Sequence, residues 1–217
     1  MAAVLGMSML LKGTFLTSPL TDVWVTSKLD CISKCYMQVN CSSVFYNSNT
    51  HLCQHGPDVY GDSQLTAAAD GTQYFIWTTV ACGNGYTWHR RLNLCYKLYE
   101  TKGTWFVAKS TCATDTGHLN RVDNADTNMF MNAVAKNLGG SVWSDASDRQ
   151  TEGAWVWSNG SVVNRFFWDD GQPAAGDTIQ SCLIIRHYGG PNRWHDDNCS
   201  QLRAFVCQLP MSEISNC

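Results

Sequence analysis

The sequence predicts an α+β fold made of two small, disulfide-rich modules. Its eleven cysteines fall into two groups, at 31–53 and at 82–207, with Cys217 left over. In the second group, two segments of helical periodicity come before a run of strands and loops, an order typical of α+β domains. A length of 217 residues fits one large or two small domains.

The composition narrows the class of protein. The hydrophobic fraction, 44%, is that of a globular chain, and the net charge is only -3. The chain has no run of Lys and Arg, so the electrostatic footprint for nucleic acid or an anionic membrane is absent. The cysteines include no Cys-x-x-Cys pair, which favours disulfides over zinc. We therefore expect a secreted, extracellular protein with no membrane span.

The first eleven residues leave two alternatives open. The apolar run from Ala2 to Leu11 is too short to span a bilayer, and the nearest basic residue, Lys12, follows it. Residues 1–11 are therefore either a signal remnant or a truncated start.

The first module is predicted at 12–80. A strand is expected over 12–21 with a turn at Pro19, and Ser27 is a candidate N-cap for a helix over 28–39. Cys31 and Cys35 are four residues apart, so they share a face of that helix. Strands are expected at 43–46 and 51–54, joined by a turn at 47–49, and the β-prone stretch 73–80 leads to the next module.

The second module is predicted at 81–210, with a tail at 211–217. It begins with a hairpin between Cys82 and Cys95 and a strand over 96–99. Helices are expected over 104–113 and 123–138, the second stopped by Gly139. Strands at 182–186 and 204–208 follow a long loop that contains an Asn-Gly turn at 158–160.

The first module resembles the PAN/apple family. The resemblance rests on Cys-x3-Cys on a helix, a cysteine after its end, an aromatic strand at 44–46 and Cys53 on a hairpin. Four cysteines permit three pairings. The family pattern implies Cys31–Cys53 and Cys35–Cys41.

The second module closely resembles the long form of the C-type lectin-like domain. The matching features are the six cysteines, Trp143, Trp155-Val156-Trp157 and the segment Trp194-x-Asp196-x-x-Cys199. Six cysteines allow fifteen pairings. The resemblance implies Cys82–Cys95, Cys112–Cys207 and Cys182–Cys199, a fold with two helices, and a long loop that binds ligand.

Family members that bind sugar do so through calcium, a hard cation that takes six to eight oxygens. The family triplet appears here as Gln172-Pro173-Ala174, in which Pro173 implies a cis bond. Ala174 has no side-chain oxygen, Gln180 is neutral, and His195 is a poor ligand for a hard cation. Asp196 keeps its position and charge, with Asp177 as a substitute ligand. The resemblance therefore implies calcium binding at the sugar site that is weak or lost.

A neighbouring structural calcium site is implied at Asp148 and Glu152. Ala175, Gln180 and Ser181 stand where its other ligands would come. Two carboxylates four residues apart in a turn are equally consistent with ordinary solvated charges.

The expected function is recognition of a carbohydrate or glycoprotein, with Gln172, Pro173, His195 and Asp196 as ligand-binding residues. The alternative is a calcium-independent, protein-binding lectin-like domain of an adhesion or matrix protein. An enzyme is not expected, since the chain has no nucleophile elbow, zinc-protease or phosphate-loop motif. Asn159 lies in the one Asn-x-Ser triplet without a central cysteine, so we expect a glycan there. The odd Cys217 leaves three alternatives open: a disulfide-linked dimer, a bridge to a segment outside this sequence, or a free thiol.

Overall fold

The computed structural model describes residues 5–10, 20–38, 41–57, 70–77, 82–83, 85–89, 91–174, 179–188 and 193–210. The chain forms two compact units that meet between Cys95 and Tyr96. The domain boundary predicted near Val80 lies outside the described residues. So do Cys217, Ala175, Asp177 and most of the strand predicted over 12–21.

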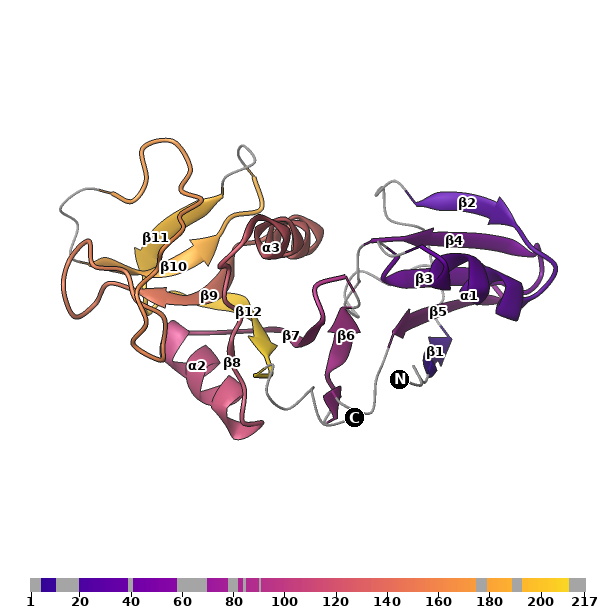
Figure 1. Cartoon of the computed structure of the whole chain (residues 1–217), viewed down its shortest axis with the longest axis horizontal. Helices are drawn as coiled ribbons and strands as arrows, with labels where there is room; N and C mark the ends of the chain where they lie inside the picture. The colour runs from indigo at the N-terminus through magenta and orange to yellow at the C-terminus, as the bar shows by residue number, and fades with distance from the viewer. Residues whose placement is uncertain are drawn as a thin grey trace. The chain divides into compact units, whose positions relative to one another are not determined.

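The first unit contains a five-stranded antiparallel sheet in the order β1-β5-β3-β4-β2 (Figure 1). Its strands are β1 (Leu5–Leu10), β2 (Thr21–Trp24), β3 (Ser43–Asn47), β4 (Leu52–Gly56) and β5 (Thr72–Trp77). The turn predicted at 47–49 forms because Asn47 Oδ1 accepts hydrogen bonds from the backbone N–H groups of Asn49 and Thr50.

Helix α1 (Lys28–Tyr36) packs against this sheet through Cys31, Ile32 and Cys35. Ser27 caps it as predicted, since its Oγ accepts from the N–H of Asp30 at 3.2 Å. The helix ends at Tyr36 and not near residue 39, where the sequence placed its end. The bridge from Cys35 to Cys41 explains the difference: a continuing helix would carry six residues about 9 Å, and the two Cα atoms lie 5.3 Å apart.

A second sheet has the order β11-β10-β9-β12-β7-β6, with β8 paired to β12, and its strands from Tyr96 onward belong to the second unit. The strands of this sheet are β6 (Thr87–His89), β7 (Leu94–Gly103), β8 (His118–Leu119), β9 (Val142–Ser147), β10 (Gln180–Ile185), β11 (Trp194–Asn198) and β12 (Arg203–Gln208). The second unit also has two helices, α2 (Trp105–Thr114) and α3 (Ala125–Leu138). They begin one and two residues later than predicted because Thr104 and Asn124 serve as N-caps.

Two buried indoles join the parts of this unit. Trp143 is fully buried on β9 and donates through Nε1 to the carbonyl of Gly103 at 2.9 Å. Trp105 on α2 donates through Nε1 to the carbonyl of Ser144 at the same distance. Each bond satisfies an indole N–H that would otherwise be buried without a partner. Together the two bonds hold β9 against α2 and the end of β7.

Five disulfides bridge the ten described cysteines, in the pairs that the two resemblances imply. They are Cys31–Cys53, Cys35–Cys41, Cys82–Cys95, Cys112–Cys207 and Cys182–Cys199. None of the helices in the described part of the chain is long and apolar enough to cross a bilayer.

Candidate functional site

The residues singled out from the sequence lie on β11 and in the long connection between β9 and β10 (Figure 1). This connection is held by aromatic packing around Trp194, which is fully buried. The ring of Trp194 contacts Trp157 and Trp168 edge-on, at centroid distances of 6.4 and 5.5 Å. Its Nε1 donates to Asn128 Oδ1 on α3 at 3.2 Å. The aromatic contacts of Trp194 and its hydrogen bond to Asn128 therefore hold this connection against β11 and α3.

The peptide bond between Gln172 and Pro173 is cis, as the resemblance implies. The next residue, Ala174, lies beside the carboxylate of Asp196. The N–H of Ala174 donates to both carboxylate oxygens, at 2.9 Å to Oδ2 and 3.1 Å to Oδ1. Asp196 is buried, and its hydrogen bonds with the N–H of Ala174 stabilise the backbone of the loop at that residue.

His195 lies between an acid and a base. Its Nε2 is 3.2 Å from Asp169 Oδ2, and Arg186 Nη1 is 3.3 Å from each ring nitrogen. Burial lowers the pKa of His195, an effect that Arg186 reinforces and that the hydrogen bond to Asp169 opposes. A neutral imidazole that donates from Nε2 and accepts at Nδ1 satisfies both neighbours.

Asp169 and Arg186 complete a polar row with His195. The hydrogen bond from His195 lowers the pKa of the Asp169 carboxyl, which keeps it ionised. The guanidinium of Arg186 also stacks on the ring of Tyr188, with its carbon 3.9 Å from the ring centroid. Tyr188 is half exposed, so the row ends at an aromatic ring open to solvent.

Asp197, next on β11, belongs to a different contact. Its Oδ2 accepts from Arg203 Nη2 at 2.8 Å and from Arg203 Nε at 3.1 Å. The acidic residues of the Trp194-to-Cys199 segment therefore divide between two roles, one that supports Ala174 and one that ties β11 to β12.

The carboxylate of Asp148 lies at the end of β9. Its Oδ2 accepts from the N–H of Gly153 at 2.9 Å, while its Oδ1 is buried without a hydrogen-bond partner in the described structure. Burial raises the pKa of Asp148, and the nearby charge of Asp196 raises it further. Glu152, its predicted companion, is exposed.

The described side chains at the sugar site offer few oxygens to a calcium ion. Ala174 offers no side-chain oxygen, His195 offers an imidazole, and the carboxylate of Asp196 accepts from the backbone N–H of Ala174. The buried Oε1 of Gln172 lacks a partner, but one amide oxygen falls far short of the six to eight that calcium takes. Within the described ranges, no group of three or more His, Cys, Asp or Glu side chains could hold a metal.

Sequence reasoning missed Asp169 and Arg186. For Arg186 a signal existed: it directly follows β10, whose antiparallel register pairs Ile184 with His195. Asp169 had none, because its approach to His195 closes a gap of 26 residues inside an irregular loop. Asn159 was expected to carry a glycan; it lies exposed in the predicted Asn-Gly turn, where its Oδ1 accepts from the N–H and Oγ of Ser161.

Comparison with known families agrees with both resemblances. The family described as Lectin C-type domain matches residues 101–209, and the family described as PAN domain matches residues 7–78.

Individual relatives match over the lectin-like part. The chain is 32% identical to C-type lectin BML-2 of Bungarus multicinctus, over 56% of this chain and 80% of that protein. It is 30% identical to perlucin of Haliotis laevigata, over 59% of this chain and 84% of that protein. The crystal structure of human lithostathine aligns with a TM-score of 0.52 at 28% identity, covering 59% of this chain and 90% of that one.

Proposed function

Because the chain belongs to the C-type lectin family and carries a PAN domain before its lectin domain, we propose that it is an extracellular recognition protein. Its long loop binds carbohydrate, free or on a glycoprotein, by direct contacts and without the usual calcium bridge. Five disulfides support an oxidising, extracellular location. The ten described cysteines are all bridged, which leaves no free thiol among them to act as a nucleophile.

The observation that carries the proposal is the row of Asp169, His195 and Arg186 beside the exposed ring of Tyr188. Sugar hydroxyls both donate and accept hydrogen bonds. An ionised carboxylate accepts from them, a guanidinium donates to them, and an aromatic ring offers an apolar face for the C–H side of the sugar. A few converging polar groups next to an aromatic surface are typical of small-molecule sites.

The chemistry around Asp196 supports calcium independence. Its carboxylate accepts from the N–H of Ala174, and the residues that would share a cation with it are Ala174, His195 and a neutral Gln180. Fewer carboxylates mean weaker calcium binding. We therefore propose that calcium is weak or absent at this loop, and that Asp196 acts by holding the backbone.

A glycan array, probed once with calcium and once with a chelator, tests this proposal. We expect the same glycans to be bound in both conditions. Arg186→Gln should weaken binding about tenfold or more, because it removes a charged hydrogen-bond donor. Lys102→Gln, which removes one positive charge from an exposed position on β7, is the matched control and should bind as the parent does.

Loss of all binding in chelator would contradict the direct-contact site. A ligand that binds in chelator but is not competed by simple sugars would instead support the protein-binding alternative. A thermal shift adds an independent measure, because a bound ion at a concentration of about a hundred times its Kd stabilises the folded state by about 2.7 kcal/mol. We expect no such gain on adding calcium.

A further inference from the structure

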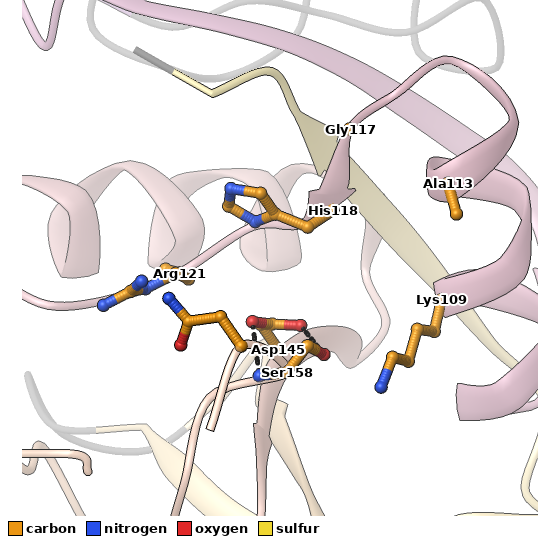
Figure 2. Close-up of a pocket in the computed structure, with 8 residues that line it drawn as sticks. Lys109, Ala113, Gly117, His118, Arg121, Asp145 and Ser158 are labelled. Carbon is orange, nitrogen blue, oxygen red and sulfur yellow. Dashed lines mark hydrogen bonds between the residues drawn. The ribbon is translucent and has the colours of Figure 1, made fainter. Parts of the chain in front are cut away.

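A pocket lies in the lectin-like unit, and its lining includes none of Asp169, His195 and Arg186. It has a volume of about 280 Å³ and is bounded by the end of α2, the chain around β8, the strand β9 and the turn after Trp157. Figure 2 shows Lys109, His118 and Arg121 arranged around a central pair, Asp145 and Ser158. Asn159, the expected glycosylation site, also lines it.

The one acid of the pocket is already satisfied. Asp145 is almost fully buried, and its Oδ2 accepts from the N–H of Ser158 at 3.0 Å. Its Oδ1 accepts from the hydroxyl of Ser158. Burial raises the pKa of Asp145, an effect that its hydrogen bonds with Ser158 oppose.

The cations of the pocket have unused donors. Lys109 Nζ lies over the ring of Trp105, 5.2 Å from its centroid, and forms no ion pair within the described structure. The guanidinium of Arg121 lies over Trp157 and, among the described carboxylates, pairs with Asp123 at 3.9 Å. Its Nε is buried without a hydrogen-bond partner in the described structure. Because that atom is closed to solvent, the donors of Arg121 left for a ligand are its terminal N–H groups.

His118 adds a third basic side chain. Its Nδ1 donates to the carbonyl of Leu119 at 2.7 Å, so its other nitrogen, Nε2, is the one left for other contacts. Neither Lys109 nor Arg121 forms an ion pair with Asp145 in the described residues. The carboxylates of Asp145 and Asp123 equal the two permanent cations in number, but in the described structure only Arg121 is paired, so the ammonium group of Lys109 remains available to an anion.

We propose that this pocket is a second ligand site that takes a small anion, a sulfate or carboxylate group. Lys109 supplies a point charge and Arg121 supplies directional N–H donors, the combination that recognises such oxyanions. The site shares no residue with the row of Asp169, His195 and Arg186. The anion comes either free in solution or as the acidic group of a sugar.

Isothermal titration of the full chain in chelator tests the proposal. The protein is made in the bacterial periplasm, so that Asn159 carries no glycan. The probes are inorganic sulfate, methyl glucuronide and glucose 6-sulfate, with neutral methyl glucoside as the control for sugar binding at the long loop. We expect the three anions to bind, and we expect Lys109→Gln to leave any binding of the neutral sugar unchanged. Lys109→Gln and Arg121→Gln should each weaken binding about tenfold, the value of one charge-assisted hydrogen bond.

The control variants separate a site from general charge. Lys136→Gln removes one charge at an exposed position on α3 outside the pocket and should leave the affinity within about twofold, as expected for a distant surface charge. Arg186→Gln, which alters the long-loop site, should also leave it unchanged. Because Arg121 packs on Trp157, each variant is checked by near-UV circular dichroism, and Lys109→Gln carries the test if Arg121→Gln fails to fold.

Equal affinity for sulfate and for the acidic sugars identifies a free anion as the ligand, whereas tighter binding of a sugar identifies an acidic glycan. Either result supports the pocket. Absence of anion binding, or equal weakening by Lys136→Gln and Lys109→Gln, would overturn it. Neither outcome depends on whether the long loop binds carbohydrate.

Discussion

Replacing Asp196 separates a structural role from a metal-binding role. Both carboxylate oxygens accept from the N–H of Ala174, at 2.9 and 3.1 Å, and the residue is 5% exposed. A hydrogen bond to a charged group contributes about 1.5–3 kcal/mol. Removing Asp196 also relieves its repulsion of Asp148, whose pKa it raises. We therefore expect Asp196→Ala to lower the free energy of unfolding by about 2 kcal/mol, even in chelator.

The assay is urea unfolding in chelator and in calcium, with two comparison variants. Asp196→Asn keeps one acceptor oxygen and should lose less than about 1 kcal/mol. Asp170→Ala removes an exposed carboxylate from the same loop and should change stability by less than about 0.5 kcal/mol. The reasoning is refuted if Asp196→Ala is as stable as the parent in chelator. It also fails if calcium stabilises the parent and not this variant, since Asp196 would then be a ligand.

Three further predictions concern stability and processing. Burial lowers the pKa of His89 from 6.5 to about 4, so the folded state resists its protonation and stability should fall as pH drops from about 6.5 to 4, by about 3 kcal/mol. Urea midpoints across that range should fall less in His89→Gln, and an equal fall would contradict the assignment. Replacing both cysteines of the Cys112–Cys207 bridge by serine opens a loop of 95 residues and should lower the free energy of unfolding by about 4.7 kcal/mol. The same change at Cys35–Cys41, which closes 6 residues, should lower it by about 2.2 kcal/mol. Equal thermal shifts in the two double variants would show that loop entropy is not the main source of this stabilisation. Asn159→Gln should increase mobility on a gel after secretion from animal cells, and an unchanged band would mean that the turn carries no glycan.

The sequence alone determined most of the fold. Cysteine number and spacing, the caps at Ser27 and Gly139 and the helical periodicities are local signals, and each reports a preference that a short segment expresses by itself. The predicted end of α1 failed because a covalent link, Cys35–Cys41, overrides local propensity. The pairing of cysteines came from family resemblance, since spacing leaves many pairings open.

The chemistry of the two sites was decided only by the tertiary structure. The sequence identified His195 and Asp196 by position. It could not show that Asp196 accepts a hydrogen bond from the N–H of Ala174, or that Asp169 lies within hydrogen-bond distance of His195. These contacts join residues 22 and 26 positions apart through an irregular loop, where no periodicity constrains which side chains meet. The same reason hides the pocket of Lys109, Arg121 and Asp145: its residues come from a helix, a loop and a strand, and only packing brings them together.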